Sequence, residues 1–157
     1  MDMACSGRNL LKNGGFRRGV APWRGRRIRR LNNPLRSGDY SIFMSAVRTG
    51  ADAVLQQTVY APFERGCAYY LYFRLLNVTP SESRTDLYAT VAYLNKNHRI
   101  IRSTPLLIRP PVQTHNWYSY FTIVPPPPRG TRMVSVVFLL GNGSLFVDYI
   151  RFASHVI

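Results

Sequence analysis

Acidic side chains are scarce in this chain of 157 residues, which has seven aspartates and glutamates against 21 lysines and arginines. Glycoside hydrolysis requires two carboxylates that face each other across a cleft at about 5–10 Å. All of the acids except Asp148 lie in sequence typical of turns, loops or the chain terminus. The three histidines adjoin no nucleophile, and the sequence has no GxSxG, HExxH or phosphate-loop pattern. We therefore expect a protein that is not an enzyme.

Long apolar runs are also absent. No stretch approaches the roughly 18–20 apolar residues that a membrane helix needs, so we expect no membrane insertion. Residues 1–8 lack the apolar core of a cleavable secretion signal. We expect an extracellular protein, at a cell or spore surface, that arrives there without such a signal. A cytoplasmic location is the alternative.

Cysteine occurs only twice, as Cys5 and Cys67. A structural zinc site needs four closely spaced ligands, and the sequence has no CxxC pair or Cys/His cluster. Three states of the thiols stay open: an intrachain disulfide, an interchain disulfide, or two free thiols. Because Cys5 lies in an N-terminal arm, it is well placed to reach a neighbouring subunit.

Helical periodicity is missing, while short strand patterns recur between glycine, proline and asparagine turns. Hydrophobic residues make up 46% of the chain, which is enough for a packed core. We predict an all-β jelly-roll sandwich of eight to ten antiparallel strands. The arm spans residues 1–8 and the sandwich domain residues 9–157. The clearest strand patterns are Tyr40–Ser45, Ala53–Val59, Tyr69–Val78, Tyr88–Leu94, His98–Arg102, Trp117–Val124, Met133–Leu140 and Leu145–Phe152.

The opening segment, residues 9–23, combines a short apolar strand, an Asn-Gly-Gly turn, an aromatic residue and a Pro-Trp turn. It is followed by Ser37-Gly-Asp-Tyr-Ser41, Leu55-Gln-Gln-Thr-Val59 and Phe146-Val-Asp-Tyr-Ile150. In this order the segments resemble galactose-binding-like jelly-roll domains, which include many carbohydrate-binding modules. They are also similar to N-terminal domains of collagen-like surface proteins of spore-forming bacteria. The resemblance implies a non-catalytic jelly roll with a surface-related role.

Many jelly-roll sugar binders hold a structural calcium ion, and the resemblance implies where its ligands would lie. An acid is expected after the Asn-Gly-x-Phe segment, where this chain has Arg17, and another at the position of Tyr149. Asp148 is thus left without its partner acid. Calcium takes several oxygen ligands and is opposed by a neighbouring guanidinium, so we expect no metal and no cofactor. We predict an Arg17–Asp148 ion pair in place of the ion.

The formal net charge is +14, and all but two of the basic residues are arginine. Residues 8–36 include ten lysines and arginines and no acid. Such a field attracts polyanions, among them nucleic acid, acidic glycans and acidic proteins. Arginine also suits contacts between subunits, and a solvated surface is a third interpretation. The candidate interface residues are Arg24, Arg26, Arg27, Arg29 and Arg30, with Cys5 and Cys67.

Four aromatic residues are candidate platforms for a sugar ring: Trp23, Trp117, Tyr118 and Tyr120. A structural role is the alternative, with Trp23 closing the end of the core and Trp117 lying in the core or at the sandwich end. Alternation along the strand puts Trp117 and Phe121 on one face and both tyrosines on the other. If Trp117 and Phe121 point inward, Tyr118 and Tyr120 point to solvent.

Tyrosine and arginine are also the residues that protein interfaces favour. We therefore predict a structural subunit that self-assembles into an extracellular filament or surface layer by exchange of its arm, with Cys5 as a possible covalent lock. A carbohydrate-binding module is the alternative. Binding of a polyanion or nucleic acid through residues 24–30 is the third hypothesis. The expected partners are thus further copies of the chain, a glycan or a polyanion.

Overall fold

The computed structural model describes residues 5–46, 51–60, 62–64, 66–80, 83–112 and 115–155. These residues form ten strands and no helix, so the predicted all-β class and strand number are confirmed. In particular, they include no helix that is long and apolar enough to cross a membrane. The strands are β1 (Arg24–Arg26), β2 (Ile28–Asn32), β3 (Tyr40–Ser45), β4 (Ala53–Tyr60), β5 (Ala68–Asn77), β6 (Asp86–Leu94), β7 (Ile100–Ile108), β8 (Tyr118–Val124), β9 (Met133–Asn142) and β10 (Ser144–His155).

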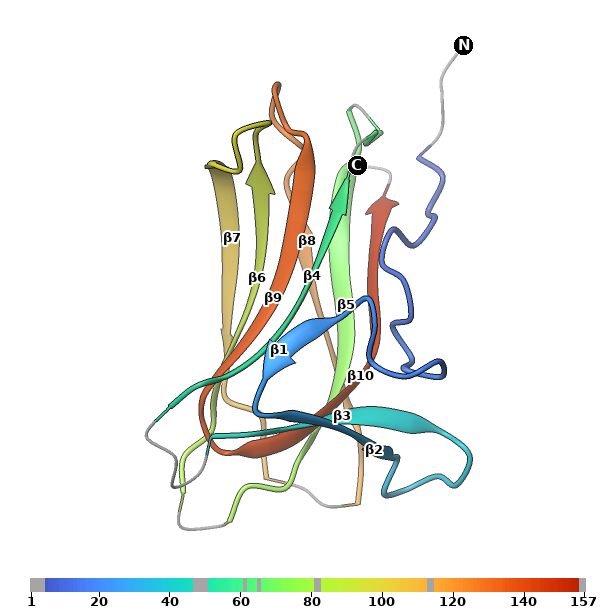
Figure 1. Cartoon of the computed structure of the whole chain (residues 1–157), viewed down its shortest axis with the longest axis vertical. Coiled ribbons are helices and arrows are strands. Elements are labelled where there is room, and N and C mark those ends of the chain that lie inside the picture. The colour runs from blue at the N-terminus through green and yellow to red at the C-terminus, as the bar shows by residue number, and fades with distance from the viewer. Residues whose placement is uncertain are drawn as a thin grey trace.

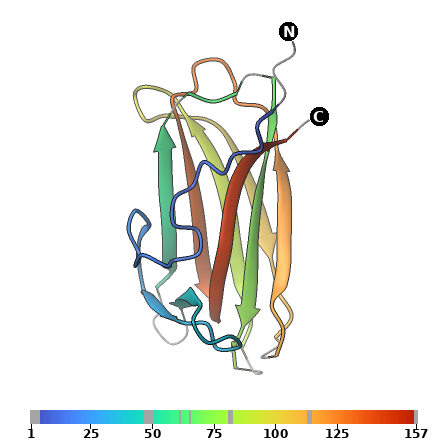
Figure 2. The same cartoon turned by 90° about the vertical axis from the view of Figure 1, so that its right-hand side faces the viewer.

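Two antiparallel five-stranded sheets pack against each other (Figure 1). Sheet 1 has the order β1-β4-β9-β6-β7, and sheet 2 has the order β2-β3-β10-β5-β8. The chain changes sheet at most of its connections, which confirms the predicted jelly roll. We call the outward side of sheet 1 face 1 and the outward side of sheet 2 face 2. Figure 2 shows β10, β5 and β8 of sheet 2 side by side.

The core lies between the sheets and follows the two-residue period of each strand. On β5, Tyr69, Leu71 and Phe73 are buried, while the side chains between them are half-buried on face 2. The ring of Phe73 meets that of Phe138 from sheet 1 edge to face, with centroids 5.0 Å apart. Each such large apolar side chain contributes about 1.5–3 kcal/mol through burial.

The sequence pattern did not predict β1 and β2. Both are short edge strands with several arginines, so they show no apolar alternation. Arg27 lies between them with a φ of 56°, and here the chain passes from sheet 1 to sheet 2. Gly25 is required on β1, because a Cβ at this position would lie 1.8 Å from the Val54 carbonyl oxygen.

The N-terminal segment runs along the edge of β10 (Figure 2). Asn9 pairs with Ala153, and the Leu10 N–H donates to the Phe152 carbonyl at 2.8 Å. The Ile150 N–H donates to the Gly14 carbonyl at 3.2 Å. A Cβ at residue 14 would lie 2.1 Å from the Ile150 carbonyl oxygen, so this close approach explains the glycine of the turn.

An intrachain disulfide joins Cys5 to Cys67 at the start of β5. Of the three states of the thiols, the structure therefore shows the intrachain one. The Ser6 N–H donates to Glu64 Oε2 at 2.8 Å, and the hydrogen bonds from Ser6 hold the pKa of the Glu64 carboxyl below its ordinary value. Cys5 is thus engaged within its own chain. The division into an arm of residues 1–8 and a domain of residues 9–157 stays a prediction.

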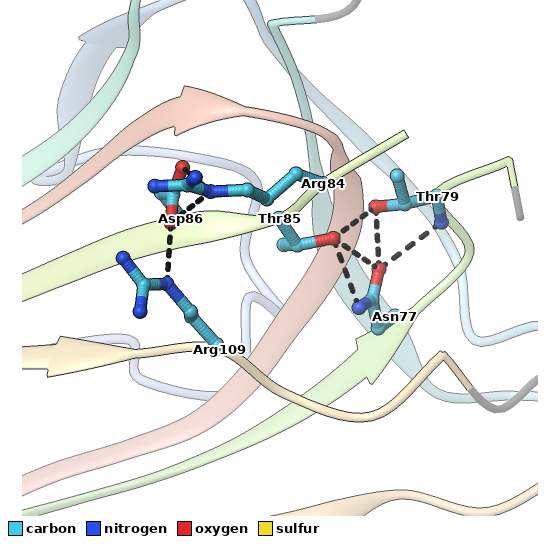
Figure 3. A network of polar contacts seen from close by, with 6 residues as sticks. All are labelled: Asn77, Thr79, Arg84, Thr85, Asp86 and Arg109. Carbon is cyan, nitrogen blue, oxygen red and sulfur yellow. Dashed lines mark hydrogen bonds and ion pairs between the residues drawn. The ribbon is translucent and has the colours of Figure 1, made fainter. Parts of the chain in front are cut away.

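A buried polar network joins the loops at one end of the sandwich (Figure 3). Asn77, which is only 1% exposed, donates to the Pro110 carbonyl at 2.8 Å and to Thr85 Oγ1 at 3.1 Å. Thr79 Oγ1 donates to the Ser144 carbonyl at 3.0 Å. These bonds tie the ends of β5, β7 and β10 together without leaving the Asn77 amide unpaired.

Next to this network, Asp86 binds two arginines (Figure 3). Arg109 Nε lies 2.9 Å and Arg84 Nε 3.0 Å from its carboxylate oxygens. Their hydrogen bonds hold the pKa of the Asp86 carboxyl below its ordinary value. The Asp86 carboxylate therefore has a structural role, in ion pairs with Arg84 and Arg109.

Candidate functional site

Two of the five candidate arginines donate hydrogen bonds to backbone carbonyl groups. Arg30 Nε donates to the Phe16 carbonyl at 2.7 Å, and its guanidinium carbon lies 3.6 Å from the centre of the Tyr40 ring. Arg27 Nη1 donates to the Asp52 carbonyl at 3.2 Å. These two residues stabilise the passage between the sheets.

The other three arginines are exposed but lie on two different faces. Gly25 pairs with the inward-facing Leu55, so its neighbours Arg24 and Arg26 point out on face 1. Arg29 alternates with Ile28, which packs against the core, and therefore belongs to face 2. The basic run does not form one continuous patch.

Both tryptophans are held by hydrogen bonds. Trp23 is only 3% exposed, and its indole N–H donates to the Asn13 carbonyl at 3.0 Å. It closes the end of the core, and its ring is not open to a ligand. Trp117 is half-buried, and its indole N–H donates to Asn33 Oδ1 at 3.2 Å. It ties the start of β8 to the loop between β2 and β3.

The predicted orientation of Tyr118 and Tyr120 is wrong. Tyr120 pairs with the inward-facing Phe73, and the two rings stack with centroids 5.8 Å apart. Tyr118 pairs with buried Leu75 and shares this inward side, although its place on an edge strand leaves it partly exposed. The outward side of β8 instead carries Phe121, which is 58% exposed.

Face 1 carries a polar strip flanked by aromatic and basic side chains. The pairing of the strands aligns Arg24, Gln56, Val137 and Thr90 in one row across β1, β4, β9 and β6. The next row contains Arg26, Val54, Leu139, Tyr88 and Leu107. Neighbouring strands are about 4.8 Å apart, so a ligand that crosses from β1 to β6 spans about 14 Å.

Side chains of face 1 are suited to both stacking and hydrogen bonding. Tyr88 is 41% exposed and offers a ring at one side of the strip, while Arg24 and Gln56 offer donors at the other. Further along, Thr58 on β4 and Ser135 on β9 are joined by a hydroxyl hydrogen bond of 2.8 Å. Face 1 thus combines hydroxyl, amide and guanidinium groups with a tyrosine ring and with the apolar side chains of Val137, Leu139 and Leu107.

Face 2 carries a second group of exposed and half-buried aromatic and basic side chains, which sequence reasoning missed. We call it the tyrosine–arginine cluster: Tyr70, Tyr72, Arg74, Phe121, Tyr149 and Arg151. Arg74 Nε donates to the Tyr72 hydroxyl at 3.2 Å, which is also 2.9 Å from Ser119 Oγ. These two hydrogen bonds lower the pKa of the Tyr72 phenol. The Arg74 guanidinium lies 4.1 Å from the centre of the Tyr149 ring.

Arg151 is ordered in the same way on the neighbouring strand. Its Nε donates to the Tyr70 hydroxyl at 2.8 Å, and its Nη2 donates to the Gly7 carbonyl. The Tyr70 ring contacts that of Phe121 edge to face, with centroids 6.4 Å apart. Both arginines of the cluster are therefore fixed by tyrosine hydroxyls and not by carboxylates.

A pocket of about 880 Å³ adjoins the cluster, between the N-terminal segment and β10. The strand pairing of β10 has a β-bulge between Asp148 and Arg151. In this bulge Tyr149 has a φ of 54°, and its side chain lines the pocket. The charged side chains that line the pocket are Lys12, Arg17, Arg18, Arg151, Asp39 and Asp148. Its wall is therefore positive on balance.

Asp148 lies in this wall, is only 4% exposed and has a carboxylate oxygen, Oδ1, without a hydrogen-bond partner. The hydroxyl of Ser41 is also buried and without a partner. Val147 pairs with Ile42, so Asp148 and Ser41 occupy the next positions along the same ladder. Burial raises the pKa of the Asp148 carboxyl to about 7, with a further contribution from Asp39.

The predicted Arg17–Asp148 ion pair is wrong, because no basic group of the described ranges lies at ion-pairing distance from Asp148. A calcium ion does not fit this place either. The ion takes six to eight oxygens, whereas Asp39 is 3.5 Å from Arg36, and Arg17 and Arg74 both act on Asp148. The one described cluster of metal-type ligands is Cys5, Glu64 and Cys67, whose sulfurs form the disulfide.

Three of the solved structures that share this fold match over nearly their whole length. The xylan-binding domain CBM22-1 of Paenibacillus barcinonensis Xyn10C has a TM-score of 0.65 at 14% identity, over 97% of both chains. A family 16 carbohydrate-binding module has a TM-score of 0.64 at 18% identity, over 92% of this chain and 99% of that one. TmCBM61, solved with beta-1,4-galactotriose, has a TM-score of 0.63 at 20% identity, over 94% and 99%.

The fold is that of carbohydrate-binding modules. The galactose-binding-like resemblance of the sequence is thereby confirmed at the level of the fold. Part of the enzymatically active domain of bacteriophage CBA120 tailspike protein 4 also has this fold, with a TM-score of 0.75 at 18% identity over 94% of this chain. This chain spans about a fifth of that one, since 21% of the tailspike chain is covered. No family model and no curated protein matches the sequence.

These comparisons correct the predicted function. The prediction of a self-assembling filament subunit is wrong, because the structures that match over their whole length are carbohydrate-binding modules. Cys5 is also not free to form the predicted covalent bond to another subunit, because it is bound to Cys67 of the same chain. The full-length matches are binding modules, in agreement with the expected lack of catalysis.

Proposed function

We propose that this chain is a non-catalytic carbohydrate-binding module that holds an oligosaccharide along face 1. The fold supports this function. The aligned rows of side chains on face 1 support this face as the binding site. The disulfide supports an extracellular location, because such bonds persist in oxidising compartments.

The chemistry of face 1 suits a sugar chain. Tyr88 offers an aromatic ring to the apolar side of a pyranose. Arg24, Gln56 and, beyond Val137, Thr90 lie in one row and offer donors and acceptors to hydroxyl groups. The hydrogen-bonded strands fix the backbone that carries these side chains, which limits the conformational entropy lost when a ligand binds.

Calorimetry with a panel of neutral β-linked xylan and galactan oligosaccharides tests the proposal. We expect one class of these oligosaccharides to bind to the wild type. Tyr88→Ala should weaken this binding at least about tenfold, which corresponds to about 1.4 kcal/mol of binding free energy. Phe121→Ala is the matched control, since it removes an exposed ring from face 2. Equal losses in the two variants would argue against face 1, and no binding by the wild type to any glycan would overturn the function.

A second experiment tests the lack of catalysis. Asp39 and Asp148 both line the pocket, so they are the described acids most suited to act on a sugar bond. We expect no new reducing ends when the bound oligosaccharide is incubated with the protein. Turnover that is lost in Asp148→Asn would show that the protein is an enzyme.

A further inference from the structure

The tyrosine–arginine cluster has the features of an anion site. Arg74 uses its Nε for the Tyr72 hydroxyl, and no acceptor in the described ranges takes its two Nη groups. No carboxylate of the described ranges lies at ion-pairing distance from Arg74 or Arg151. Asp148 pairs with Arg74 across the strands and acts on it from beyond ion-pairing distance. Guanidinium groups that are fixed in this way without an ion-paired acid are suited to bind a carboxylate or sulfate with paired hydrogen bonds.

The same face carries exposed rings next to these cations. The strand pairing puts Phe121, Tyr72 and Arg151 in one row across β8, β5 and β10. Phe121 is 58% exposed and Tyr149, under the Arg74 guanidinium, is 44% exposed. An exposed ring beside a fixed cation suits a pyranose that carries an anionic group.

The tyrosine–arginine cluster adjoins the pocket of about 880 Å³ beyond β10, which Tyr72, Tyr149 and Arg151 also line. Lys12, Arg17 and Arg18 add cations to its wall. The two acids of the wall offset them only in part, because Asp39 is paired with Arg36 and Asp148 is almost completely buried. The pocket can therefore extend a site for a chain with several anionic groups.

We propose that face 2 holds a second glycan site, separate from face 1, which binds acidic oligosaccharides through Arg74, Arg151 and the exposed rings of Phe121 and Tyr149. The anionic group is a carboxylate or a sulfate ester on the sugar. A glycan is favoured over nucleic acid because solved carbohydrate-binding modules share this fold. The proposal does not depend on binding at face 1.

Calorimetry with three matched ligands tests the second site: a galacturonate oligomer, its neutral methyl ester, and a sulfated galactan oligomer. We expect at least one acidic oligomer to bind at least about tenfold more tightly than the neutral ester. Arg74→Gln and Phe121→Ala should each weaken this binding about tenfold. Whichever acidic oligomer binds identifies the anionic group.

Arg24→Gln is the control, because it removes the same charge from face 1. Near-wild-type binding in this variant supports a local site, whereas equal losses in Arg24→Gln and Arg74→Gln would show that net charge alone acts. Equal binding of the neutral ester, or no binding of either acidic oligomer, would also overturn the proposal. So would a single-stranded oligonucleotide that competes at the same side chains. Thermal unfolding of each variant shows that the fold is intact.

Discussion

Asp148 is the most deeply buried acid among the described residues, and its raised pKa makes stability depend on pH. The folded-state pKa is about 7 against an ordinary value of 3.8, so the folded protein binds the proton more tightly than the unfolded chain. Its contribution to stability is complete below about pH 4 and is lost as the pH rises through 7. The upper bound of this loss is about 4 kcal/mol.

We therefore expect Asp148→Asn to be more stable than the wild type at pH 8 and not at pH 4. Urea unfolding at a series of pH values measures the difference. Asp86→Asn is the control with the opposite sign, because Arg109 and Arg84 lower the pKa of Asp86 and its contribution is lost as the pH falls. A destabilised Asp148→Asn at pH 8 would mean that the charged carboxylate has a partner in solution.

Single residues also show where sequence reasoning failed. The orientation of Tyr118 and Tyr120 was reversed because a shift of one residue moves every side chain to the other face. We expected the largest apolar residues of this strand to point inward, yet Phe121 points out. On an edge strand both sides are partly exposed, so size and polarity alone do not determine which side faces the core.

At the scale of elements, the central strands were predictable and the edge strands were not. Strands β3 to β6, β9 and β10 carry apolar residues at a two-residue period between clear turns. β1 and β2 consist largely of arginine and glycine or single apolar residues, and they exist because β4 and β3 supply their partners. The candidate site on face 1 depends on β1, so its arginines could be named from the sequence but not placed.

The disulfide stabilises the N-terminal segment against the sandwich. It closes a loop with a sequence separation of 62, for which the loss of chain entropy in the unfolded state predicts about 4 kcal/mol. We expect the double variant Cys5→Ser, Cys67→Ser to lose about 2–4 kcal/mol of unfolding free energy. Urea unfolding measures this loss.

Ser6→Ala is the control for local contacts, because it removes one hydroxyl hydrogen bond to Glu64 and keeps the disulfide. We expect it to cost about 1 kcal/mol or less, since the bond is exposed. Wild-type protein in reductant should unfold like the double variant. An unchanged unfolding midpoint after reduction would contradict this account.

At the scale of the whole molecule, the excess of arginine over acidic residues is compatible with several functions. Exposed arginine and tyrosine suit subunit contacts, glycans and polyanions alike, so composition could not choose between them. The proposed glycan function is based on the fold, and the proposed acidic-glycan site is based on the ordering of Arg74 and Arg151 by tyrosine hydroxyls. Both observations depend on the pairing of β5, β8 and β10, which are distant in sequence.

The net charge of +14 also has a consequence for the folded molecule as a whole. Like charges repel each other more in the compact state than in the unfolded chain, and salt screens this repulsion over about 10 Å at 0.1 M. We expect the unfolding temperature at pH 6 to rise as sodium chloride increases from about 0.01 to 0.3 M. Binding of an acidic oligosaccharide on face 2 should weaken over the same range, and binding of a neutral one on face 1 should not change. A falling unfolding temperature would show that attractive pairs outweigh the repulsion.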